Sequence, residues 1–247
     1  MKVFRVLMKT EIKLALRGMD SIFFGVLFPV GLALILGVIY GDKAAYPGAG
    51  YTELQQSFGA ISAIGICATG LMGVPLSISE YRHRKILKRF KVTPVSPGML
   101  LLIQVTVQFL IALLSFGAVT LVMTLVFGYR MPGSPWMFLV AYFLVLLAMY
   151  GIGMMIASLA PNIKTANLLC SLIYFPMLFL SGATVPYEIM PKTMQRVTDV
   201  LPLTQGIKLM KGFSLGTDMG NLLFAVILML GLALVSILVS IKFFRWE

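Results

Sequence analysis

Residues 80–97 read Glu-Tyr-Arg-His-Arg-Lys-Ile-Leu-Lys-Arg-Phe-Lys-Val-Thr-Pro-Val-Ser-Pro. This basic block lies between two long apolar runs and holds six of the twenty lysine and arginine residues in the chain. Almost everything else reads as lipid-embedded helix or as a short connection. We therefore interpret the basic block as the place where a membrane-embedded protein meets something soluble.

Composition excludes an ordinary soluble domain. The 247 residues are 59% hydrophobic and 12% charged, whereas about a quarter of the residues in soluble domains are charged. The net charge of +11 would suit nucleic acid in a soluble chain. In a membrane protein, however, cations collect on loops beside the anionic cytoplasmic leaflet. We therefore predict a polytopic all-α membrane protein that binds no nucleic acid.

Six uncharged runs predict the membrane spans. They are residues 21–41, 55–79, 98–127, 134–160, 166–181 and 221–241. Crossing about 30 Å of hydrocarbon takes about 20 helical residues, so five of the runs are long enough. The run at 166–181 is short and contains Pro176, so we expect it to cross partway, to tilt, or to continue into a re-entrant segment. The whole chain, 1–247, is read as one transmembrane domain.

Lysine and arginine counts orient these spans. With both termini in the cytoplasm, the cytoplasmic segments hold fourteen of these cations and the external segments hold six. The positive-inside rule therefore places the basic block in the cytoplasm, in a multi-pass protein of the cell membrane.

The first twenty residues carry a stripe of cations, formed by Lys2, Arg5, Lys9, Lys13 and Arg17. Their spacing of three and four confines them to one side of a helix. This pattern predicts an amphipathic helix in the membrane interface, with cations toward lipid headgroups and apolar residues toward acyl chains. The alternative is an ordinary basic flank of the first span. Glu11 lies on the apolar side and needs a partner, for which residues 82–91 are a candidate.

The connection at 182–220 is the longest outside the spans. Apolar residues recur along it at roughly helical spacing, and Pro186, Pro191 and Pro202 punctuate it. We interpret it as short external helices that dip back into the outer leaflet. The alternative is a loop that only packs over its neighbours.

Missing features narrow the mechanism. None of the six runs contains an ionisable residue other than tyrosine or cysteine, although ion-coupled carriers normally keep an acid or a base near mid-bilayer. The chain also lacks a phosphate-binding loop, so any ATPase is a separate chain. Cys67 and Cys170 lie in apolar runs, and no cysteine and histidine spacing indicates a metal site. A stand-alone carrier or channel is the alternative, and a membrane enzyme is disfavoured because no catalytic constellation is visible.

Within the basic block, a helix is expected to emerge from the second span. Ile86, Leu87 and Phe90 would share one apolar edge, and Arg82, Lys85 and Arg89 another side. Thr93-Pro94 and Ser96-Pro97 would then stop it. A short stiff element between two spans can pass a push from a soluble partner. The alternative is a solvated basic loop.

The layout resembles the ABC-2 type membrane subunits of ATP-binding-cassette transporters over essentially the whole chain. The resemblance rests on Glu80, Arg82 and Arg84, then Thr93, Pro94 and Ser96, on Leu180-Ser181-Gly182 with Pro186, and on Pro202-Leu203-Thr204. It implies a non-catalytic permease, paired with an identical or related permease and with two ATPase subunits that hold ATP and Mg. It also implies export, most simply of a hydrophobic or amphipathic compound such as a drug, antibiotic, lipid-like molecule or peptide.

The resemblance also assigns roles to residues. Those implied to form the coupling helix are Glu80, Arg82, Arg84, Lys85, Ile86, Leu87, Arg89, Phe90, Thr93 and Pro94. A transport path along the first, second and fifth spans would have as polar candidates Ser57, Ser62, Thr69, Asn167 and Ser171. Hydroxyls in membrane helices are more often satisfied by their own backbone, which is the alternative for each serine and threonine.

Overall fold

The computed structural model describes residues 2–41, 43–46, 48–86, 97–184, 187, 190–217 and 222–243. In this part of the chain the elements are helices, with one isolated antiparallel bridge between Ala44 and Thr52 and no longer strand. The all-α class predicted from composition is therefore confirmed.

Six helical segments in the described residues are long and apolar enough to cross a membrane. The first joins the π-helical segment η1 (Phe23–Leu27) to α3 (Phe28–Tyr40), and the second joins α4 (Glu53–Cys67), the π-helical segment η2 (Ala68–Gly73) and α5 (Val74–His83). The other four are α7 (Pro97–Phe127), α8 (Pro135–Leu159), α9 (Ile163–Leu180) and α12 (Leu222–Phe243). The predicted number of spans is confirmed.

The short fifth run becomes a full span because a polar turn extends it at its start. The side chain of Asn162 accepts a hydrogen bond from the backbone N–H of Thr165 at 2.9 Å, which caps the first turn of α9. With this turn α9 has 18 residues, about 27 Å at 1.5 Å per residue. Pro176 lies inside the helix without ending it.

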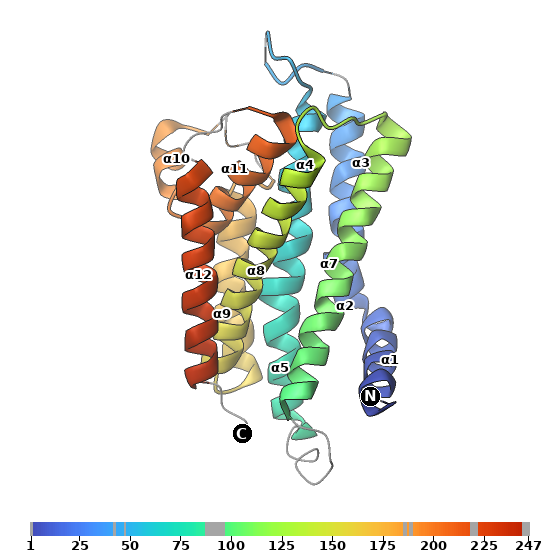
Figure 1. Ribbon diagram of the computed structural model, residues 1–247, viewed down its shortest axis with the longest axis vertical. Helices are drawn as coiled ribbons and strands as arrows, with labels where there is room; N and C mark the ends of the chain where they lie inside the picture. Colours follow the sequence, from blue (N-terminus) through green and yellow to red (C-terminus); the bar gives the residue numbers. More distant parts are fainter. Residues whose placement is uncertain are drawn as a thin grey trace.

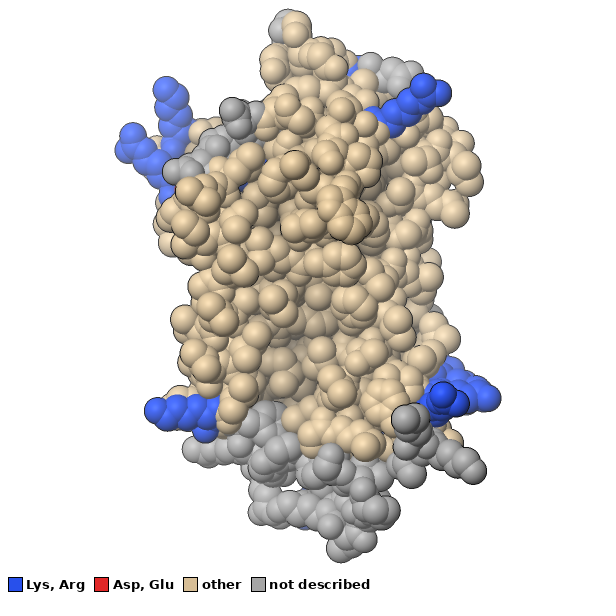
Figure 2. Space-filling view, viewed as in Figure 1, with Lys and Arg blue, Asp and Glu red and all other residues tan. Residues whose placement is uncertain are grey.

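The second and fourth spans form the centre of the bundle (Figure 1). In their most apolar stretches 78% and 61% of residues are buried, against 22–28% in the other four spans. The outer helices therefore present apolar side chains outward. In Figure 2, lysine and arginine side chains lie near the two ends of the molecule, with an uncharged band between them. This distribution fits a bilayer around the middle.

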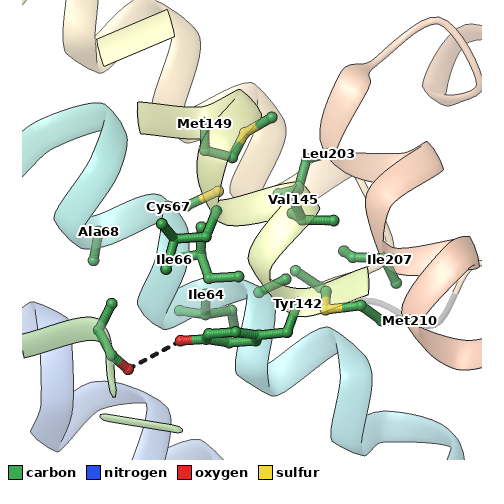
Figure 3. Close-up of a cluster of buried hydrophobic side chains, with 14 of the residues drawn as sticks. Ile64, Ile66, Cys67, Ala68, Tyr142, Val145, Met149, Leu203, Ile207 and Met210 are labelled. Carbon is green, nitrogen blue, oxygen red and sulfur yellow. Dashed lines mark hydrogen bonds between the residues drawn. The ribbon is translucent and has the colours of Figure 1, made fainter. Parts of the chain in front are cut away.

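Backbone contact locks the two central spans together. A Cβ atom on Gly153 of α8 would lie 2.0 Å from the carbonyl oxygen of Gly70 in η2, so only glycine fits there. Nearer the other end of α8, apolar side chains of the second span and α8 pack together (Figure 3). There the hydroxyl of Tyr142 donates to the carbonyl oxygen of Ala112 at 3.0 Å.

The described part of residues 182–220 contains two short helices, α10 (Lys192–Thr198) and α11 (Pro202–Leu215). α11 packs against α4, α8 and α12, and ten of its fourteen residues are buried, including Leu203, Ile207 and Met210. The predicted short helices are therefore present, and α11 is part of the core. That this region dips into the outer leaflet stays a prediction.

The bundle has two distinct ends in Figure 1. The start of α1 (Lys2–Arg17), the end of α5, the start of α7 and the end of α12 lie at one end, which we call the α1 end. α10 and α11 lie at the opposite end, the α11 end. Placement of the α1 end in the cytoplasm stays a prediction from the charge counts.

Candidate functional site

The basic block begins inside the second span and not on a separate helix. α5 ends at His83, and its last carbonyl oxygens accept hydrogen bonds from the N–H groups of Arg84 and Lys85. Lys85 has φ = 55°, a left-handed conformation that is uncommon for a residue with a side chain. The single helix expected from residue 80 is therefore interrupted by a turn, and Glu80 and Arg82 belong to the second span.

The rest of the expected coupling helix lies outside the described residues, namely Leu87, Arg89, Phe90, Thr93 and Pro94. Pro97 opens α7, where its missing N–H costs nothing. The second span and α7 each contain 31 residues, about 46 Å at 1.5 Å per residue. Both helices are longer than the hydrocarbon layer requires, so they can project from the membrane as the two helices that flank residues 84–96.

Exposed basic residues cluster at the end of α5 and in the turn after it. His83, Arg84 and Lys85 are exposed, and we call these three residues the basic turn. Arg84 pairs with Glu80 one helical turn earlier, with an Nη2 to Oε1 distance of 2.6 Å. Such exposed pairs contribute only a few tenths of a kcal/mol. The basic turn is therefore a surface that a partner can reach, and it includes His83, which was not among the residues assigned to the coupling helix from the sequence.

Arg82 has a different position from the one expected. Its Nη1 and Nη2 atoms donate to the carbonyl oxygens of Ala160 and Ala157, at 2.7 and 3.0 Å. These carbonyls end α8, where a positive charge is favourable. Arg82 thus joins the end of the second span to the end of the fourth span. At least these two of its donors act inside the bundle and not on a partner.

The helix α1 is amphipathic, but its apolar side faces protein. Phe4, Leu7, Met8, Ile12 and Ala15 pack with Ile103, Val107 and Ile111 of α7. These five residues are only partly buried there, so their contact with acyl chains in the membrane interface stays a prediction. The cations Arg5, Lys9, Lys13 and Arg17 are exposed, and so are Val6 and Leu14, whereas the side chain of Lys2 lies outside the described part. α1 runs beside the α1-end half of α7 (Figure 1).

Glu11 lies on this protein-facing side of α1. Its Oε1 atom accepts a short hydrogen bond from the hydroxyl of Tyr81 on α5, and its Oε2 atom accepts one from Nε2 of Gln104 on α7 at 2.7 Å. The described partners are thus two neutral side chains, one on each of the helices that flank residues 84–96. Residues 87–91, part of the expected partner, lie outside the described residues.

The five polar candidates for a transport path do not share one surface. Hydroxyls of Ser57, Ser62 and Thr69 donate to carbonyl oxygens four residues earlier in their own helix, at 2.8–2.9 Å, and all three residues are buried. Their own backbone therefore satisfies them, as the alternative proposed. Asn167 is exposed and Ser171 is half-buried, and both lie on the outer side of α9.

Sequence reasoning missed a buried cation at the α11 end. Lys211, one of the six cations that the charge count assigned to external segments, is only 3% exposed, because α11 folds into the bundle. It lines a cavity of about 30 Å³ together with Tyr40, Gln56 and Ser57, among others. A cavity of that size holds about one water molecule, whereas ligand sites measure about 300–1,000 Å³. The helical spacing of Ile207, Met210 and Lys211 was the available signal.

A clamp of polar side chains holds the α11 end. Lys208 pairs with Asp199 at 2.6 Å, and its Nζ atom lies 4.1 Å from the ring centre of Tyr187. The Tyr187 hydroxyl donates to Asp199 Oδ2 at 3.0 Å. Burial raises the pKa of Tyr187. Burial opposes the charge of Lys208, but its hydrogen bonds to Asp199 and Tyr187 raise its pKa overall.

We expect this clamp to weaken in alkali. The pKa values of Tyr187 and Lys208 are both raised on folding. These two groups therefore stabilise the folded state below their unfolded pKa values, about 10 to 10.5. It is lost as the pH rises through the folded values. The unfolding temperature of the purified chain should therefore fall more steeply above pH 10 than that of the control variant Asp199→Asn/Lys208→Met. Parallel curves for the two proteins would contradict this prediction.

The sequence of this chain is similar to sequences of known membrane proteins. The chain matches the profile of the ABC-2 type transporter family over residues 2–215. It is 36% identical over 75 residues to nodulation protein J of Rhizobium leguminosarum bv. viciae, which is 30% of this chain and 29% of that protein. It is 28% identical over 150 residues to the inner membrane transport permease YhhJ of Escherichia coli K12, which is 60% of this chain and 40% of that protein.

These relatives are matched over less than half of their own length. The family profile, by contrast, covers α1 through α11, and therefore includes the basic turn, the flanking helices and five of the six spans. A multi-pass helical membrane architecture and the motifs quoted above agree with that match. The chain therefore belongs to the ABC-2 type transporter family.

Proposed function

We propose that this chain is the membrane-spanning permease subunit of an ATP-driven exporter for a hydrophobic or amphipathic compound. The observation that carries the proposal is the exposed basic turn at the end of the second span. Arg82 joins that span to the fourth span. A separate ATPase docking there would push directly on the second span. The chain is then a non-catalytic subunit, and ATP and Mg are held by the partner.

The central spans can carry such a push. Arg82 connects α5 to α8 at the α1 end, and the contact of Gly70 with Gly153 connects the same spans deeper in the bundle. Between these points lie η2 and Pro75, and π-helical turns and prolines are places where helices bend. Movement of the basic turn would therefore reach α8 while the second span flexes at η2.

A complete transporter requires further subunits in this proposal. Two permeases, identical or related, and two ATPases assemble with the α1 end, including both termini, in the cytoplasm. The exposed cations of α1 meet anionic lipid headgroups. A path between the permeases would be lined by outward faces such as that of α9, which exposes Asn167, Leu168 and Leu172.

Charge reversal at the basic turn tests the ATPase contact. The variant Arg84→Glu/Lys85→Glu should lower permease-dependent stimulation of the co-purified ATPase about tenfold, because like charges across an interface cost several kcal/mol. Arg82 is left intact, since its change would also disturb the fold. The measurement is ATP hydrolysis by the complex in liposomes, with and without the permease.

A matched reversal at the other end provides the control. Lys192 and Arg196 are exposed on α10, and Lys192→Glu/Arg196→Glu should leave the stimulation unchanged. Unchanged hydrolysis and export in Arg84→Glu/Lys85→Glu would contradict the proposal. Transport by the isolated chain in liposomes without any ATPase would favour the carrier or channel alternative.

A further inference from the structure

One carboxylate joins the two helices that flank residues 84–96. Tyr81 lies two residues before α5 ends, and Gln104 lies seven residues after α7 begins. Glu11 of α1 accepts a hydrogen bond from each of them, one on each carboxylate oxygen. Tyr81 and Gln104 lie 70 and 93 residues after Glu11 in the sequence, so three helices meet at a single side chain.

The surroundings of this contact make it strong. Gln104 is 5% exposed, and Leu100, only 1% exposed, packs beside it with Leu7, Tyr81 and Met99. Glu11 is half-buried, and removing its donors leaves carboxylate oxygens without hydrogen bonds, which costs about 1–3 kcal/mol. Glu11, Tyr81 and Gln104 therefore form a bridge that holds α1, α5 and α7 at one spacing.

A second contact keeps the two flanking helices in the same register. Gln108, one turn after Gln104, donates to the hydroxyl of Ser77, one turn before Tyr81, at 3.4 Å. Gly73 makes room for it, because a Cβ atom there would lie 2.5 Å from the Gln108 side-chain oxygen. This second contact lacks α1. Within the described residues, the hydrogen bonds of Glu11 link the helix with the exposed cations to both flanking helices through one side chain.

We propose that Glu11 is a positioning residue that makes α1, α5 and α7 move as one unit when the basic turn is pushed. The inference rests on the proposed function, because it concerns how the ATPase movement enters the bundle. Without the bridge, α1 would move relative to α5 and α7, and part of the push would be lost at the membrane surface. α1 then has a mechanical role in addition to its contact with lipid.

Three variants on one helix test this role in the permease–ATPase complex. Glu11→Ala removes both acceptors and should lower the ratio of stimulated to basal ATP hydrolysis about tenfold. Glu11→Gln should retain the ratio within about twofold, because its amide can accept from Tyr81 and donate to a flipped Gln104. Thr10→Ala is the control, since Thr10 is exposed and its hydroxyl donates to the Val6 carbonyl oxygen of its own helix. Equal ratios in wild type and Glu11→Ala would overturn the inference.

A measurement without the ATPase separates this inference from the proposed function. In the purified chain, hydrogen exchange of the α1 amides should be about tenfold faster in Glu11→Ala than in wild type, and close to wild type in Glu11→Gln. Unchanged exchange in Glu11→Ala would overturn the bridge itself. Faster exchange in Glu11→Ala supports the bridge, whatever the complex does. If the wild-type complex shows no stimulated ATP hydrolysis, only the proposed function is overturned.

Discussion

Replacing Gly153 by alanine is expected to destabilise the bundle by about 3 kcal/mol, the upper end of the usual cost of overpacking. The added Cβ would lie 2.0 Å from the Gly70 carbonyl oxygen and 3.4 Å from Cδ of Pro75. The closest of these partners is backbone, so no side-chain rotation relieves the contact and the two central spans must separate. Thermal unfolding of the purified protein in detergent, with its elution profile, measures the effect.

Gly117→Ala is a control that is expected to increase the stability of the protein. It lies in α7, and among the described residues nothing comes within 4 Å of an added Cβ atom. Alanine there should stabilise the helix by about 0.5–1 kcal/mol, because glycine loses more backbone entropy on folding. A similar loss of stability in Gly117→Ala and Gly153→Ala would show that the contact with Gly70 is not the cause.

Replacing Arg82 by methionine is expected to cost about 3 kcal/mol and to uncouple the ATPase. Methionine keeps much of the aliphatic stem but removes the donors to Ala157 and Ala160, each a hydrogen bond from a charged group. The favourable charge at the end of α8 is lost as well. Thermal unfolding and stimulated ATP hydrolysis should therefore fall together, since the arginine connects the second span to the fourth.

Arg84→Met is the matched control for stability. Arg84 is two residues later, but its partner Glu80 is an exposed side chain of the same helix. Its loss should change the free energy of unfolding by about 0.5 kcal/mol or less. If Arg82→Met proved no more destabilising than Arg84→Met, the link between α5 and α8 would not carry the role assigned to it here.

Glu11 and Arg82 together explain why neighbouring residues in the basic block have different roles. Arg84 and Lys85 are exposed and available to a partner, whereas Arg82 and Tyr81 face inward and bind α8 and α1. Residues 81–85 therefore form a boundary, with exposed side chains on one side and internal links on the other. A charge-reversal experiment that mixes both groups would not distinguish docking from transmission.

Spans, class and family could be read from the sequence alone. A membrane helix needs about 20 apolar residues in a row, and cations stay out of it, so both signals are local and visible along the chain. The amphipathic pattern of α1 is local too, because a helix repeats every 3.6 residues. Hence Arg5, Lys9 and Lys13 were placed correctly on one exposed side of a helix.

Only the tertiary structure decided what each polar side chain touches. Glu11 meets residues 70 and 93 positions away, and Arg82 meets carbonyls 75 and 78 positions away. Lys211 is buried because α11 folds into the bundle, which a count of loop charges cannot reveal. Such contacts depend on how helices pack against each other, and helical periodicity defines the faces of a helix without naming the neighbour that covers them.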